Sequence, residues 1–137
     1  MKTIVLGYDE TPAAERALQR TAELAKAFRS SVVVTSVSPI AVAGARGGGP
    51  IDPADPPERH REQFEHARAR FEELGLQVEG VATAGDPASA IVELAEERGA
   101  DLIVVGTREP GFFERILGQS VSGDVTHQAR CDVLIVH

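Results

Sequence analysis

The residues best suited to chemistry lie together in one stretch, residues 104–122. Glycines and serines stand out in it: Gly106, Gly111, Gly118, Ser120 and Ser122. Glycine lets a backbone approach phosphate closely, and a helix N-terminus with hydroxyl side chains offers N–H and O–H donors to an anion. Glycine-rich loops also follow strands for turn geometry alone. The stretch therefore indicates either a phosphate-binding loop or an ordinary turn.

An acidic turn follows the first apolar run of the chain, at Asp9 and Glu10. Asp9 has a functional interpretation, as a hydrogen-bond acceptor for a ligand or as a ligand of Mg²⁺. It also has a structural one, as part of the turn that caps the next helix. Asp86 precedes Pro87 in a similar pattern, and for Asp86 the role of helix cap is favoured over that of ligand.

Charge and composition argue against several classes of function. The formal net charge is −7, so the chain repels a phosphate backbone and nucleic acid is not expected as a partner. The only lysines, Lys2 and Lys26, follow no glycine loop, which excludes a P-loop. The four histidines are scattered and none pairs with Cys131 at metal-ligand spacing, so no zinc site is expected. Cys131 is expected to be a small buried residue rather than a nucleophile.

The same composition bears on location. A single cysteine favours a reducing compartment, and no apolar run is long enough to cross a bilayer. The sequence enters a strand pattern at once, with no signal peptide. The cytoplasm is therefore the expected location, and a membrane partner is not expected.

Strands and helices alternate along the chain and must position these residues. Short apolar, β-branched runs predict strands at residues 3–8, 31–37, 76–82, 101–106 and 132–137. Helical spacing predicts a helix of about five turns from Pro12, with Thr11 as its cap, and further helices at about 57–74, 86–99 and 120–129. Residues 38–57 hold a glycine triplet and five prolines and are expected to form a long mobile loop.

This alternation predicts one α/β domain over residues 1–137, a doubly wound five-stranded parallel sheet with right-handed crossovers. The doubly wound strand order expected here is 3-2-1-4-5. Ligands of such sheets bind outside the carboxyl ends of the strands, where the strand order reverses. The rule directs attention to Tyr8 and Asp9, to the loop after Val37, to residues 83–86 and above all to the loop after Gly106.

Three stretches resemble the universal stress protein family. They are IVLGYDETPAAERALQRTAELA near the start, GDPASAIVELAEERGADLIVVGT in the second half, and GQSVSGDVTHQARCDVLIVH at the end. The resemblance implies a fold like that of the adenine nucleotide alpha hydrolases. It also implies a site for ATP or a related adenine nucleotide, with Mg²⁺ as a candidate companion. Adenine would lie near the acidic turn after the first strand.

The phosphate loop of that family is only partly kept. In nucleotide-binding members it reads Gly, two residues, Gly, nine residues, Gly, then Ser or Thr. Gly106 matches the first glycine, whereas Glu109 and Gln119 stand at the other two. A carboxylate at Glu109 repels phosphates, which Arg108 could offset. The nucleotide contacts implied by the match and by the strand ends are Tyr8, Asp9, Val37, Gly106, Arg108, Gly118, Gln119, Ser120, Val121 and Ser122.

Two functional hypotheses stay open. The first is a non-catalytic, nucleotide-binding module of stress-response signalling, favoured by Gly106, Gly118 and the two serines. The second is an interaction protein of the same fold that binds no nucleotide and acts through a dimer and a further protein partner, favoured by Glu109 and Gln119. An enzyme is the weakest interpretation, because no Ser/His/Asp set is suggested by position.

A homodimer is expected through the terminal strand, residues 131–137. In the order 3-2-1-4-5 this strand lies at a sheet edge, where unpaired N–H and C=O groups invite pairing with a second copy. Its apolar residues face both sides of the sheet, and the family resemblance implies the same antiparallel pairing about a two-fold axis.

Overall fold

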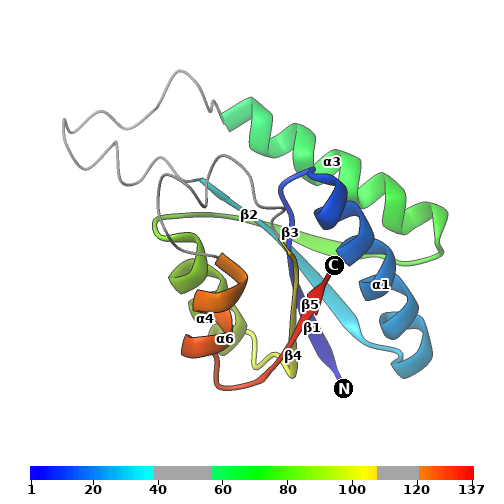
Figure 1. The fold of residues 1–137 in the computed structure, drawn as a ribbon. Coiled ribbons are helices and arrows are strands. Elements are labelled where there is room, and N and C mark those ends of the chain that lie inside the picture. Colours follow the sequence, from blue (N-terminus) through cyan, green and yellow to red (C-terminus); the bar gives the residue numbers. More distant parts are fainter. Residues whose placement is uncertain (39–56, 108–120) are drawn as a thin grey trace.

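The computed structural model describes residues 1–38, 57–107 and 121–137, which form a five-stranded sheet with helices on both faces (Figure 1). The strands pair in parallel in the order β3-β2-β1-β4-β5, which confirms the expected topology. The elements in chain order are β1 (Thr3–Gly7), α1 (Pro12–Phe28), β2 (Ser31–Ser38), α3 (Pro57–Glu73), β3 (Val78–Ala84), α4 (Pro87–Glu97), β4 (Leu102–Gly106), α6 (Val121–Gln128) and β5 (Asp132–Val136).

The sheet separates two hydrophobic cores. Helices α1 and α3 cover one face, and α4 and α6 cover the other (Figure 1). Ile4 and Leu6 of the middle strand point into the α1/α3 core, and Val5 points into the opposite one. All three side chains are fully buried, as expected of a parallel strand covered on both faces.

The helix starts follow the predicted caps. The Thr11 hydroxyl accepts a hydrogen bond from the backbone of Ala14 at 3.1 Å, and Pro12 occupies the first turn of α1. The carboxylate of Asp86 accepts one from Ser89 N at 3.0 Å at the start of α4. Capping of this kind satisfies N–H groups that have no partner within the helix. The interpretation of Asp86 as a helix cap is therefore confirmed.

The third strand begins two residues later than expected, at Val78 rather than Leu76. The reason is the way α3 ends. Gly75 has a φ of 82°, and Leu76 N donates to the carbonyl of Phe71 at 2.9 Å, which closes the last turn of the helix. Leu76 therefore belongs to the helix stop and not to the strand.

The outer strand β5 differs from its neighbour β4 in burial. Four residues of β4 are buried, whereas Val133 to Val136 of β5 are only partly buried. Leu134 and Val136 contact the α1/α3 core, and Val133 and Ile135 contact the other. The terminal strand thus lies at an edge with apolar side chains on both faces, as expected from the sequence.

Cys131, just before β5, corrects one expectation. It is partly exposed rather than buried, and β5 is the outermost strand of the sheet that the described residues form. Partial burial, followed by the charge of Asp132, raises the pKa of the Cys131 thiol. A raised pKa leaves little thiolate at neutral pH.

Candidate functional site

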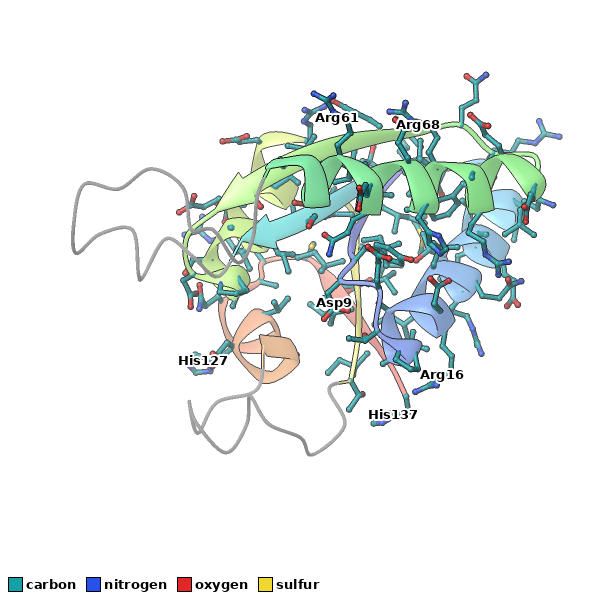
Figure 2. The ribbon with its side chains drawn as sticks, turned by 90° about the horizontal axis from the view of Figure 1, so that it is seen from above. Asp9, Arg16, Arg61, Arg68, His127 and His137 are labelled. Atoms are coloured by element: carbon teal, nitrogen blue, oxygen red, sulfur yellow. The ribbon has the colours of Figure 1, made fainter. Side chains whose placement is uncertain are left out.

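The strand order reverses at β1, whose carboxyl end lies between those of β2 and β4. Figure 2 looks down on this edge of the sheet, with Asp9 near its centre, Arg16 and His137 together at one side and His127 on α6 at the other. Ligands of doubly wound sheets bind at such an edge. The candidate site is therefore built from the turn after β1, the ends of β2 and β3, the end of β4 and the start of α6.

Gly106 ends β4 where the strand meets the first turn of α1. A Cβ atom at Gly106 would lie 2.7 Å from both the carbonyl carbon and the oxygen of Ala13, and 3.0 Å from its Cβ. Backbone atoms of a helix cannot move aside cheaply. Glycine is thus required here by packing, whether or not a phosphate also approaches.

The acidic turn takes the structural role that the sequence allowed. Asp9 Oδ1 accepts hydrogen bonds from the backbone and hydroxyl of Thr11, at 3.1 and 2.6 Å. Thr11 in turn caps α1, and Glu10 between them has a left-handed backbone with a φ of 62°. Asp9 is exposed at the carboxyl edge, so its position is fixed by the cap while it faces the candidate site.

The side chain of Tyr8 points away from this edge into the α1/α3 core, with 3% of its surface exposed. Its hydroxyl donates to Glu15 Oε1, and its ring stacks on His66 with centroids 6.3 Å apart. The backbone N–H of Tyr8 donates to the carbonyl of Thr35 at 2.9 Å. The Tyr8 side chain therefore anchors the turn at Asp9 to the α1/α3 core.

Two hydroxyls meet near the ends of β2 and β3, a feature that the sequence analysis did not identify. The hydroxyls of Thr35 and Thr83 lie 3.0 Å apart, and Thr35 is fully buried. Strand alternation places Thr35 on the same face as Val33, toward α4 and α6. Threonine near the carboxyl ends of two successive strands was the available signal.

The other predicted site residues are only partly placed. Val37 pairs with Thr83 in the register of β2 and β3, but its side chain is outside the described part of the chain. Val121 and Ser122 begin α6, again without described side chains. The predictions at Arg108, Glu109, Gly118, Gln119 and Ser120, and most of the loop predicted at 38–57, fall outside the described residues.

The described residues also limit what else could bind. They include no group of three or more His, Cys, Asp or Glu placed to hold a metal ion, and no helix long and apolar enough to cross a membrane. A groove of about 690 Å³ lies at the opposite end of the sheet, lined by Lys26 and Arg29 among others. It adjoins the C-terminus of α1, whose dipole disfavours an anion.

Fold and site together define a doubly wound α/β protein with a candidate ligand site at the switch point. The universal stress protein family model matches residues 1–137. A universal stress protein of Methanocaldococcus jannaschii is 34% identical over 98% of this chain and 81% of its own length. One of Synechocystis is 31% identical over 98% and 85%. The chain belongs to the universal stress protein family.

Solved structures of universal stress proteins resemble this chain over nearly its whole length. A universal stress protein in complex with cAMP is 29% identical, with a TM-score of 0.75, and the match covers 99% of this chain and 96% of that one. The universal stress protein of Archaeoglobus fulgidus in complex with dAMP is 26% identical, with a TM-score of 0.77 and coverage of 100% and 98%.

Replacing Gly106 by alanine tests whether this glycine is a packing requirement. We expect Gly106→Ala to lower the free energy of unfolding by about 1–3 kcal/mol, the usual cost of overpacking, in urea denaturation without nucleotide. Gly123→Ala, at an exposed position of α6, is the control and should keep or raise stability. Equal stability of Gly106→Ala and the native chain would show that the approach to Ala13 is looser than described.

The ionisation of Tyr8 offers a second check. Burial, and then the hydrogen bond to Glu15, raises the pKa of Tyr8 above its ordinary value of 10.0. The folded chain keeps a proton that the unfolded chain releases near pH 10, so the free energy of unfolding should fall as pH rises past that point.

Tyr8 is the only tyrosine, so ultraviolet absorbance of tyrosinate reports on it alone. We expect the Tyr8 hydroxyl of the native protein to stay protonated until the protein unfolds, whereas in denaturant it should ionise as an ordinary tyrosine does. In Glu15→Gln the Tyr8 hydroxyl should ionise at a lower pH than in the native chain, since the substitution removes the neighbouring negative charge. A native titration that matches the denatured one would refute the burial of the Tyr8 hydroxyl.

Proposed function

We propose that this chain binds an adenine nucleotide at the carboxyl edge of its sheet and acts in stress response through that binding, without catalysing a reaction. The observation that carries the proposal is the full-length similarity to structures solved with cAMP and with dAMP. Both ligands share an adenine, a pentose and one phosphate, so these three groups are what the site should recognise.

The strand ends support an orientation for that nucleotide. Adenine would lie against the turn at Asp9 and beside Val37, where β1 and β2 end. The phosphates would lie over the segment that begins at Gly106, toward the start of α6 at Val121 and Ser122. A helix N-terminus provides backbone N–H groups and a partial positive charge for an anion.

ATP with Mg²⁺ is the finer form of this proposal. Mg²⁺ usually keeps several waters and is held by substrate phosphates with one or two carboxylates. Among the described residues Asp9 fits that role, because it is the acidic side chain at the centre of the edge (Figure 2). The geometry thus suits a metal held mainly by the nucleotide.

We propose no catalysis because the polar side chains described at this edge form hydrogen bonds with one another. The hydroxyls of Thr35 and Thr83 bond to each other, and one oxygen of Asp9 bonds to Thr11. A nucleophile normally needs an adjacent base that is itself oriented by a third group. These three side chains do not form such a set.

Calorimetry with AMP, ADP and ATP on desalted protein tests the proposal. We expect binding of all three, with GTP much weaker because the site is matched to adenine. No heat and no thermal shift at millimolar nucleotide would reject it. That outcome would favour the second candidate, an interaction protein with an altered phosphate loop, for which Glu109 and Gln119 are the supporting observation.

We further propose a homodimer formed by antiparallel pairing of β5 with its copy. The support is the partial exposure of four apolar residues on this edge strand, and burial of such surface is favourable. The same patch would meet itself across a two-fold axis.

Light scattering over a concentration series tests the dimer. The carbonyl of Val136 accepts from Thr107 N, so the backbone of Leu134 also faces β4, whereas that of Ile135 faces the open edge. We expect twice the chain mass for the native protein and for Ile135→Val, which keeps the backbone donor. Ile135→Pro removes an N–H from the edge and should give a monomer. A native protein that stays monomeric at high micromolar concentration would rule out this dimer.

A further inference from the structure

Four side chains join α3 to the end of β1 and the first turn of α1. We call Tyr8, Glu15, His66 and Arg70 the Glu15 cluster, since the Glu15 carboxylate lies at its centre. Oε1 of Glu15 accepts the Tyr8 hydroxyl and lies 3.0 Å from His66 Nε2. Oε2 lies 3.9 Å from Arg70 Nε.

Donors outnumber the hydrogen bonds that the carboxylate makes. Arg70 Nε is buried and has no hydrogen-bond partner among the described residues, because 3.9 Å is too long for one. Tyr8 and His66 meanwhile share a single oxygen. A small rotation of Glu15 would strengthen one of these contacts at the expense of another.

The cluster is linked to the candidate site through a closed ring of contacts. Tyr8 is followed directly by Asp9, and Asp9 accepts hydrogen bonds from Thr11. The carbonyl of Thr11 accepts one from Glu15 N at 2.9 Å, and the Glu15 side chain returns to Tyr8. A shift of the Glu15 carboxylate therefore acts on the turn that holds Asp9.

The charged and titratable groups around His66 come from each neighbouring element. Helix α1 supplies Glu15, and the end of β1 supplies the titratable hydroxyl of Tyr8. Glu10 adds a negative charge near that tyrosine. Helix α3 itself supplies Arg70, which also lies 3.8 Å from Glu73.

The strands beneath α3 add no further charge to the cluster. The segment Ser31–Ser38 contains no ionisable residue, and its Ser36 hydroxyl donates to Gln63 of α3. Glu79, the only charged residue of β3, pairs with Arg98. Among these groups histidine is the one whose charge ordinarily changes between about pH 5 and 8.

We propose that His66 is a pH-sensitive positioning residue, which on protonation draws Glu15 toward α3 and away from the Tyr8 hydroxyl and so resets the turn that holds Asp9. A charged donor makes the stronger hydrogen bond, so protonated His66 outcompetes the neutral tyrosine for the shared oxygen. Its ring also stacks on Tyr8, where a cation is attracted to the aromatic face. The consequence for nucleotide affinity rests on the proposed function, whereas the contact itself does not.

Intrinsic fluorescence tests the contact without any ligand. The chain has one tyrosine and no tryptophan, so its emission comes from Tyr8 alone. We expect the emission to change along a single titration curve between about pH 5 and 8, with the midpoint at which the His66 ring signals shift in NMR spectra. Far-UV circular dichroism should stay constant over that range.

Two variants and a control make the test specific. His66→Gln should abolish the titration of the emission, and Glu15→Gln, which keeps an acceptor oxygen but no charge, should reduce it. His127→Gln replaces an exposed histidine on α6, on another part of the molecule (Figure 2), and should leave it unchanged. An emission that does not titrate in the native chain, or that still titrates in His66→Gln, would overturn the proposal.

A second arm examines the link to the site. The probe is cAMP, whose phosphodiester keeps the same charge over this pH range. Its affinity for the native chain should differ about two- to fivefold between the two ends of the range, as expected for a half-exposed ion pair, and should not differ in His66→Gln. Titration of the emission with equal cAMP affinities would overturn the link to Asp9. Absence of cAMP binding at every pH would reject the proposed function, and the emission alone would then test the contact.

Discussion

The end of β4 packs so closely on the first turn of α1 that Gly106 has no room for a side chain. This approach fixes where the first turn of α1 lies against the end of β4, and α1 begins right after β1. The carboxyl ends of β1 and β4, the capped turn of α1 and the start of α6 consequently lie at one edge. That edge is the candidate ligand site.

Residues at this edge serve the fold and the candidate site at once. Asp9 and Thr11 complete the cap of α1, and Gly106 permits the packing of β4. Their presence alone is thus explained by folding, and the case for a nucleotide rests on the solved relatives and on the anion-binding tendency of the helix start. A site whose framework is needed for stability would persist even in a chain that had lost the ligand.

Most of the fold could be predicted from the sequence because its signals are local. Apolar runs, proline after a capping residue and glycine after a helix place the elements, and their alternation indicates a doubly wound parallel sheet. The start of β3 was misplaced because Leu76 looks like a strand residue but closes α3. Cys131 was expected to be buried from its residue type alone, although the expected strand order already placed residues 131–137 at a sheet edge.

The candidate site could be predicted only in outline. The switch-point rule selected the strand ends, yet the orientation of Tyr8 depends on His66, which is far away in sequence and reaches it only through the packing of α3. The same holds for the pair formed by Thr35 and Thr83. Long-range contacts between polar side chains leave no periodic trace in the sequence, so the Glu15 cluster could not have been anticipated.

The most direct test of an adenine-nucleotide site at the carboxyl edge is a map of backbone amide chemical shifts during addition of AMP. The account predicts that the shifts gather at Asp9, at the end of β2, at Gly106 and Thr107, and at the first residues of α6. Shifts confined to the groove beside Lys26 and Arg29, at the other end of the sheet, would contradict it. A spectrum unchanged at millimolar AMP would contradict it equally.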